Sequence, residues 1–191
     1  MRIILASNSP RRREILSQLG IQFEVIPSKF EENVSKMNPE NLAMYFAEEK
    51  AMSVAKNIKE EALIIGADTI VYQNGVMGKP KDNQDAARML KNLSGVFHTV
   101  ITGISLVHTS SLKKVTDYEK TLVKFKNMSD DEIQAYIKSG EPMDKAGAYA
   151  IQGIGSLLVE KIEGCYFNVV GLPVYRLSKI LDGFGYKILG R

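Results

Sequence analysis

Serine and arginine residues gather where the sequence predicts the start of a helix near the N-terminus. Ser9 is a favoured N-cap, and Pro10 suits the first helical position. A helix N-terminus carries about half a positive charge, so arginines at 11–13 are unfavourable there unless an anion is bound. Free N–H groups, the hydroxyls of Ser7 and Ser9 and guanidinium groups all bind phosphate well. The segment therefore predicts a phosphate site; arginines directed into solvent are the alternative.

A second unusual feature is Asp68, a carboxylate within the apolar run 64–71. Such a group is costly unless it is paired, hydrogen-bonded or bound to a metal. Gly66, two residues earlier, allows another backbone or a ligand to approach closely. Glu31 and Glu32 offer further oxygen ligands, and carboxylates together with phosphate oxygens suit Mg²⁺. The alternatives are a structural aspartate and a solvated acidic pair.

Three lysines form a third group of candidate ligand contacts, and the small residues after Lys145 leave room for a ligand. Lys79 sits in the loop Gly78-Lys79-Pro80, Lys145 is followed by small residues, and Lys50 lies on a predicted helix. Solvated surface lysine is the alternative for each. His98 and His108 lack metal-ligand spacing, so we interpret both as structural. Cys165 lacks a basic neighbour, so we expect no nucleophilic role for it.

The elements that must position these residues alternate between apolar strands and amphipathic helices, which is typical of α/β folds. We expect a mixed twisted sheet flanked by helices. The predicted strands are 2–6, 21–26, 62–72, 96–108, 115–125 and 156–162, the fourth and fifth of them antiparallel. The predicted helices are 10–20, 39–55, 82–93, 129–140 and one that starts at Pro173.

Composition limits the function classes. The 191 residues predict one domain or two small lobes, and 45% hydrophobic with 25% charged residues exclude a disordered scaffold. No apolar stretch is long enough for a bilayer and no export signal is recognised, so we expect no membrane contact. One cysteine favours a reducing cytoplasm. A net charge of +3 gives little support for nucleic-acid binding.

Taken together, the motifs resemble the Maf family of nucleoside triphosphate pyrophosphatases. The matching blocks follow the family's order over nearly the whole chain: Ala6-Ser7-Asn8-Ser9-Pro10-Arg11-Arg12, Gly66-Ala67-Asp68-Thr69, Gly78-Lys79-Pro80, Ser94-Gly95 with His98, Glu141-Pro142 through Tyr149, Ile151-Gln152-Gly153 and Val170-Gly171-Leu172-Pro173. The resemblance implies a single Maf-like domain over 1–191, similar to inosine triphosphatases, with the active site in a cleft between two lobes. It also implies a nucleoside triphosphate substrate, a divalent cation (Mg²⁺ or Mn²⁺) and a homodimer.

Residue roles follow from the same resemblance. Asp68 matches the catalytic position that accepts a proton from water, beside a metal that Glu32 also binds. Arg12, Thr69 and Gln152 match the positions that separate substrate subfamilies and resemble the branch acting on dTTP and UTP. The expected substrate contacts are Ser7, Ser9, Arg11, Arg12, Lys50, Thr69, Lys79, Lys145 and Gln152. Arg13 leaves open which guanidinium meets phosphate.

The expected reaction is hydrolysis between the α and β phosphates, giving a nucleoside monophosphate and pyrophosphate. Gln152 would read a pyrimidine edge with one donor and one acceptor, or make a structural hydrogen bond instead. Thr69 would contact substrate or simply fill a strand position. Two rival functions remain: a Maf-type pyrophosphatase with another base preference, such as 7-methyl-GTP, and a non-catalytic nucleotide sensor linked to cell division and septum formation.

Overall fold

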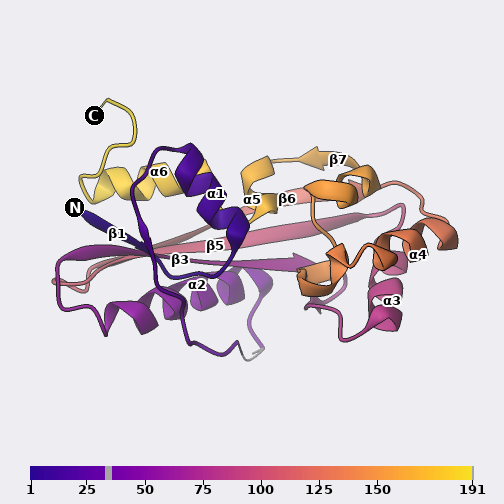
Figure 1. Ribbon diagram of the computed structural model, residues 1–191, viewed down its shortest axis with the longest axis horizontal. Coiled ribbons are helices and arrows are strands. Elements are labelled where there is room, and N and C mark those ends of the chain that lie inside the picture. Colours follow the sequence, from indigo (N-terminus) through magenta and orange to yellow (C-terminus); the bar gives the residue numbers. More distant parts are fainter. Residues whose placement is uncertain (33–35, 191) are drawn as a thin grey trace. The chain divides into compact units, whose positions relative to one another are not determined.

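The computed structural model describes residues 1–32 and 36–190 (Figure 1). Its strands form one seven-stranded sheet in the order β2-β1-β3-β5-β6-β7, with β4 paired to β3. β1 is parallel to β2 and β3, whereas β3–β4 and β6–β7 are antiparallel, so the predicted mixed sheet is confirmed. The strands are β1 (Arg2–Leu5), β2 (Glu24–Val25), β3 (Ala62–Tyr72), β4 (Val76–Met77), β5 (Phe97–His108), β6 (Lys114–Phe125) and β7 (Val159–Glu163).

The helices begin and end close to the predicted signals. Asp82 and Ser129 cap their helices with side-chain hydrogen bonds, and Ser129 with Glu132 forms the predicted capping box. The α-helices are α1 (Pro10–Gln18), α2 (Pro39–Ala55), α3 (Asn83–Leu93), α4 (Asp130–Lys138), α5 (Tyr166–Val170) and α6 (Val174–Gly183). Three 3₁₀ segments cover Glu141–Asp144, Ala146–Ala148 and Gly153–Leu158. No helix in the described part of the chain is long and apolar enough to cross a bilayer.

Three sequence predictions need correction. The strand predicted over 21–26 shrinks to Glu24–Val25, the short α5 was missed, and the strand predicted from Ser156 begins only at Val159. In the last case Gly153 adopts a φ of +69°, and the Ser156 hydroxyl donates to the Gly153 carbonyl at 2.7 Å. This local turn favours a 3₁₀ segment over an extended strand.

The chain divides into two compact units. Unit 1 comprises Met1–Asp68, Thr102–Glu119 and Gly171–Arg191; unit 2 comprises Thr69–Ile101 and Lys120–Val170. In unit 1, α2 lies on one side of β1 and β3, with α1 and α6 on the other (Figure 1). Its buried side chains include Ile4, Ala6, Ala51, Val54, Ala55, Ala62, Ile64 and Val107.

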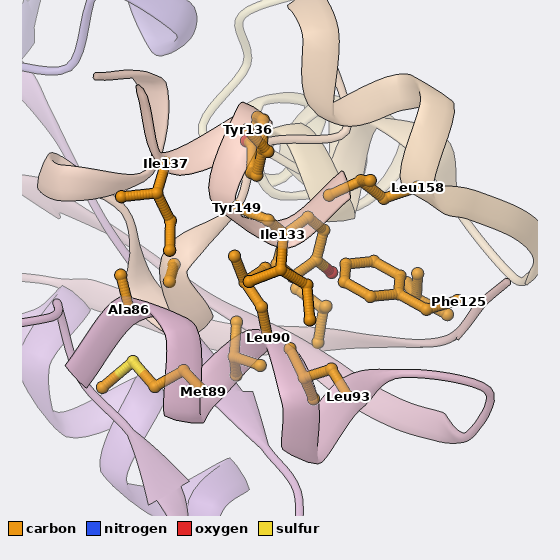
Figure 2. Close-up of a cluster of buried hydrophobic side chains, with 14 residues drawn as sticks. Ala86, Met89, Leu90, Leu93, Phe125, Ile133, Tyr136, Ile137, Tyr149 and Leu158 are labelled. Atoms are coloured by element: carbon orange, nitrogen blue, oxygen red, sulfur yellow. The ribbon is translucent and has the colours of Figure 1, made fainter. Parts of the chain in front are cut away.

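Unit 2 has its own apolar core, where α3 and α4 pack together (Figure 2). The rings of Phe125, His98 and Tyr149 meet edge to face, with centroids 4.7–5.3 Å apart. Such contacts add to the stability that burial itself provides. The irregular segment between α4 and β7 is thereby anchored at Tyr149. The core also includes Leu90, Leu93, Ile133, Tyr136, Ile137 and Leu158.

Candidate active site

Lys50 joins the two acidic residues that the sequence singled out. Its Nζ donates to Oδ1 of Asp68 at 2.6 Å and to Oε1 of Glu32 at 2.5 Å. The side chains of Lys50 and Asp68 are 14% and 9% exposed, whereas that of Glu32 is 49% exposed. One ammonium group therefore bridges a shielded carboxylate and an accessible one.

Close packing of α2 against the sheet brings Lys50 to Asp68. A Cβ on Gly66, in β3, would lie 2.2 Å from the Ala47 carbonyl oxygen of α2. A Cβ on Gly103, in β5, would lie 2.2 Å from the Ala43 carbonyl oxygen. Because real Cβ atoms do not approach backbone this closely, both glycines are needed for the helix to sit where it does. The role predicted for Gly66, close approach of another backbone, is confirmed.

Two serines tie the segment that precedes Glu32 to the same helix. The hydroxyls of Ser28 and Ser53 lie 2.7 Å apart, and Ser53 donates to the Lys50 carbonyl at 2.9 Å. The Phe30 N–H donates to the Ser28 hydroxyl at 3.0 Å. The Glu32 carboxylate is thus held near Lys50 by its chain as well as by its ion pair.

The electrostatics of Asp68 suit a group that accepts a proton. Burial raises the pKa of Asp68, and the negative charge of Glu32 raises it further, while Lys50 and Arg12 oppose both effects. A carboxylate with a raised pKa is a stronger base than a solvated one, and the charges of Lys50 and Arg12 favour its ionised form. We refer to Asp68, Glu32, Lys50 and Arg12 as the Asp68 cluster.

Arg12 is the buried arginine of this cluster, and its charge acts on Asp68. It is 9% exposed; its Nε donates to the Gly171 carbonyl at 2.7 Å and its Nη1 to the Ser7 hydroxyl at 3.1 Å. The Ser9 N–H also donates to that hydroxyl, at 3.2 Å. Burial lowers the pKa of Arg12, and the charge of Asp68 opposes this effect. A guanidinium stays charged under these conditions, so a fixed cation lies near Asp68.

The other residues of this turn are placed differently. Ser9 precedes α1 in extended geometry, but its side chain makes no capping hydrogen bond. Arg13 is exposed and donates to the Asn8 carbonyl at 3.0 Å. Arg11 is half-buried. The structure thus distinguishes the three arginines: only Arg12 is buried, while Arg13 folds back onto the preceding loop.

Unit 2 brings two predicted lysine loops together. The Gly147 N–H donates to the Gly78 carbonyl at 3.0 Å, which joins the loop of Lys79 to that of Lys145. Gly147 adopts a φ of +69°, and a Cβ there would lie 2.9 Å from Val71 Cγ1. Lys79 is exposed, whereas the Lys145 side chain is 14% exposed and ion-paired with Asp144.

Thr69 and Gln152 also belong to unit 2. Thr69 is half-buried and follows Asp68 directly on β3. Gln152 is half-buried and precedes the turn at Gly153.

The carboxylates of the Asp68 cluster fit a divalent cation. Asp68 and Glu32 both come within 2.6 Å of one cationic nitrogen, so their oxygens converge on a common region. The described residues contain no set of three or more His, Cys, Asp or Glu side chains placed to hold a metal. Mg²⁺ typically binds through one or two carboxylates and fills its remaining positions with water and phosphate oxygens. Two carboxylates therefore suffice for a cation that arrives with a polyphosphate.

The histidines and the cysteine belong neither to the Asp68 cluster nor to the loops of Lys79 and Lys145. His98 is buried, its Nε2 lies 2.8 Å from the Tyr149 hydroxyl, and burial lowers its pKa to about 4. His108 Nε2 lies 3.1 Å from Glu61. The Cys165 carbonyl accepts from Thr121, and the Cys165 N–H donates to the same hydroxyl. The contacts of both histidines agree with the structural interpretation.

Sequence reasoning assigned no role to two contributors, although both lie in blocks that match the family. Gly171 holds Arg12 through a carbonyl oxygen, which leaves no signal in residue type. Glu141 accepts from the Tyr136 hydroxyl and from the N–H groups of Ile154 and Gly155. A signal existed for Glu141, since an acid followed by proline in a glycine-rich region suggests a carboxylate that satisfies backbone N–H groups.

Comparison with known proteins places these observations in a family. The chain matches the family of Maf-like proteins over residues 2–184 and therefore belongs to it. A protein of Thermoanaerobacter sp. (strain X514) named dTTP/UTP pyrophosphatase is 59% identical over 182 residues, which are 95% of each chain. A protein of Acetivibrio thermocellus, also named dTTP/UTP pyrophosphatase, is 51% identical over 196 residues, which cover 99% of this chain and 98% of that one. The resemblance drawn from the motifs is confirmed.

The fold has a counterpart among solved structures. The Staphylococcus aureus Ham1 protein superposes with a TM-score of 0.51 at 12% identity, covering 96% of this chain and 100% of that one. At this identity the likeness concerns the fold alone.

Proposed function

We propose that this protein hydrolyses dTTP and UTP between the α and β phosphates, releasing the nucleoside monophosphate and pyrophosphate. The observation that carries this proposal is the Asp68 cluster, in which a buried carboxylate is ion-paired with a lysine and also feels the charge of a buried arginine. Relatives named dTTP/UTP pyrophosphatase, which match this chain over almost their full length, support the substrate assignment.

Asp68 is the proton acceptor in this mechanism. The water oxygen forms a bond to the α-phosphorus, the bond from that phosphorus to the bridging oxygen breaks, and pyrophosphate leaves. The water proton passes to Asp68, whose raised pKa favours this step. Lys50, 2.6 Å from Asp68, orients the carboxylate and becomes a partner for phosphate oxygens when the nucleotide binds.

Arg12 neutralises charge on the polyphosphate. Its Nε and Nη1 are fixed by Gly171 and Ser7, so the guanidinium is held in place before substrate arrives. A preorganised cation stabilises developing negative charge without reorganising during the reaction. Ser7, Ser9 and Arg11, on the same turn, add donors for the phosphates.

Glu32 and Asp68 would hold the divalent cation, Mg²⁺ or Mn²⁺, together with phosphate oxygens. When bound, the ion lowers the pKa of a coordinated water and polarises phosphate oxygens. The exposure of Glu32 suits a ligand that meets a cation delivered with the nucleotide. Until then Lys50 is ion-paired with both carboxylates.

We also propose substrate contacts for four residues of unit 2. Lys79 and Lys145, on loops joined by a backbone hydrogen bond, contact phosphate oxygens. Gln152 reads the pyrimidine edge, and Thr69 makes a substrate contact next to Asp68. Mutation of each residue followed by kinetics with dTTP tests these assignments.

A homodimer and a cytoplasmic location complete the proposal. The first rests on the family resemblance and the second on the single cysteine, Cys165. Sedimentation of the purified protein tests the dimer, and fractionation of cells tests the location.

A nucleotide panel tests the proposed function. Nucleoside triphosphates, including dTTP, UTP, CTP and 7-methyl-GTP, are incubated with Mg²⁺ or Mn²⁺ and the products are separated by chromatography. We expect monophosphate plus pyrophosphate, formed fastest from dTTP and UTP. Faster cleavage of 7-methyl-GTP would overturn the base assignment, and diphosphate plus phosphate would overturn the assigned bond. Tight nucleotide binding without products under any metal would favour a sensor.

A further inference from the structure

The segment that carries Gln152 depends on Glu141 for its backbone hydrogen bonds. Glu141 Oε2 accepts from the Ile154 N–H at 3.0 Å, and Oε1 accepts from the Gly155 N–H at 2.9 Å. The Tyr136 hydroxyl donates to Oε1 at 2.8 Å and accepts from the Ala150 N–H at 3.2 Å. Because this segment lies outside sheet and α-helix, these bonds largely define its path.

These hydrogen bonds hold the backbone on both sides of Gln152. Ala150 lies two residues before it and Ile154 two residues after it, and both are tied to the Glu141–Tyr136 pair. Tyr136 is itself fixed, since it projects from α4 into the core of unit 2 (Figure 2). We call Glu141 and Tyr136 the Gln152 clamp.

Two glycines show how closely the clamp meets the backbone. A Cβ on Gly153 would lie 2.5 Å from Glu141 Oε2, and a Cβ on Gly155 would lie 2.6 Å from the Tyr136 hydroxyl. Gly153 also has a φ of +69°, in the left-handed region that favours glycine. The turn that follows Gln152 is therefore shaped to receive the carboxylate.

Glu141 serves this segment as an anion. Burial alone would raise the pKa of Glu141, but the hydrogen bonds from Gly155, Tyr136 and Ile154 and the charge of Lys145 lower it overall. An ionised carboxylate only accepts hydrogen bonds, which matches the three donors around it. A glutamine there would direct an NH₂ group at a donor or lose one contact.

Orientation of the Gln152 amide decides what it reads. Thymine and uracil present a carbonyl acceptor where cytosine presents an amino donor. A carboxamide carries one accepting and one donating end, so the same side chain turned over matches cytosine instead. Discrimination between the two kinds of pyrimidine thus requires a fixed backbone beneath Gln152.

We propose that Glu141, with Tyr136, is a positioning residue that orients Gln152 and thereby sets the preference for thymine and uracil over cytosine. The inference rests on the proposed function, because it assumes that Gln152 meets the base of a nucleoside triphosphate. It adds a residue that does not itself touch substrate. Its effect acts through the backbone at Ala150, Ile154 and Gly155.

The test compares kcat/KM for UTP and CTP in the full-length protein and in E141Q, Q152A and the double variant. E141Q should lower the UTP:CTP ratio by about tenfold, mainly through a higher KM for UTP, with the same products. Once Q152A has removed the reading group, adding E141Q should lower the ratio no further. A ratio unchanged in E141Q, or losses that add in the double variant, would overturn the inference.

Two further variants keep the test decisive. Y136F removes only the hydroxyl of the clamp and should also lower the UTP:CTP ratio of kcat/KM, by a smaller factor. This variant tests the inference if E141Q does not fold. The control is E163Q, since Glu163 is exposed on β7 and pairs with Lys161 at 2.8 Å; its ratio should stay unchanged. Failure of the unaltered protein to cleave UTP would refute the proposed function, whereas cleavage with a constant ratio across E141Q and Y136F would refute this inference alone.

Discussion

The ammonium group of Lys50 donates to Oδ1 of Asp68 at 2.6 Å, and both side chains are largely shielded from solvent. The contact joins α2 to β3, two elements whose packing depends on Gly66. Lys50 lowers the pKa of Asp68 against the opposing effect of burial. The ionisation of Asp68 therefore depends on Lys50, and this dependence has consequences that can be measured.

Removing the Lys50 charge should move the acidic limb of the pH profile of kcat/KM to higher pH. In K50M, burial and Glu32 both raise the pKa of Asp68, and only Arg12 among its named neighbours opposes them. The acidic limb of that profile reports the ionisation of a group in the free enzyme, which we assign to Asp68. At neutral pH we also expect kcat/KM for dTTP to fall about 100-fold. K59M, which alters an exposed lysine, is the control; an unmoved limb in K50M would contradict the assignment of the limb to Asp68.

Glu32 should govern the requirement for the divalent cation. In E32Q one carboxylate of the proposed metal site becomes an amide, so half-maximal activity should need about tenfold more Mg²⁺. The acidic limb should move to lower pH, because Glu32 raises the pKa of Asp68. The matched control is E31Q at the neighbouring exposed position, where both properties should stay the same. Equal Mg²⁺ titrations for E32Q and E31Q would remove Glu32 from the site.

Gly66 should be required for stability and activity together. In G66A the new methyl group meets the Ala47 carbonyl and Ala51 of α2, which forces the helix away from β3. Overpacking of this kind costs about 2 kcal/mol, a fall of about 6 °C in Tm for a chain of this size. Since α2 carries Lys50, turnover should fall as well.

The control for this substitution is G183A, because a Cβ on Gly183 has no neighbour within 4 Å. Its Tm should not fall below that of the unaltered protein, because alanine favours a helix more than glycine does, and its turnover should be unchanged. Equal Tm values for G66A and G183A would show that α2 can shift without cost.

His98 should make the fold less stable in mild acid. Burial lowers the pKa of His98 to about 4, against an ordinary value of 6.5. Between these values the unfolded chain binds a proton that the folded chain does not, so the free energy of unfolding falls as pH drops, by about 3 kcal/mol in all. Above 6.5 this contribution is fully present.

Denaturant unfolding of the protein and of H98Q at pH 7.5, 5.5 and 4.5 measures the effect. The difference in unfolding free energy between the two should shrink or reverse towards low pH, since glutamine does not titrate. Parallel pH dependences would show that His98 ionises equally in both states.

Features that depend on residues close together in the sequence could be predicted, whereas contacts between distant residues could not. Strand β3, its hairpin turn and the caps at Asp82 and Ser129 follow from local chemistry and are confirmed. Asp68 has the partner that its apolar setting predicts, but residue spacing could not identify that partner. Lys50 lies 18 residues from both Glu32 and Asp68, and only the packing of α2 brings the three together.

Other features depend on contacts that residue type does not encode. Burial of Arg12 relies on a carbonyl 159 residues away, so the sequence could not show which of the three arginines is buried. The strand predicted from Ser156 was wrong because Glu141 and the turn at Gly153 impose a 3₁₀ path. The substrate roles of Lys79, Lys145, Thr69 and Gln152 stay predictions.

Replacement of Asp68 by asparagine tests the central claim most directly. D68N keeps the shape of the side chain, and Lys50 retains Glu32 as a partner. Its Tm should equal or exceed that of the unaltered protein, because a buried acid with a raised pKa destabilises the fold when ionised. Pyrophosphate release from dTTP and UTP should fall about 1,000-fold or more, while D182N, an exposed control on α6, keeps full turnover. Near-normal turnover by folded D68N would contradict the account.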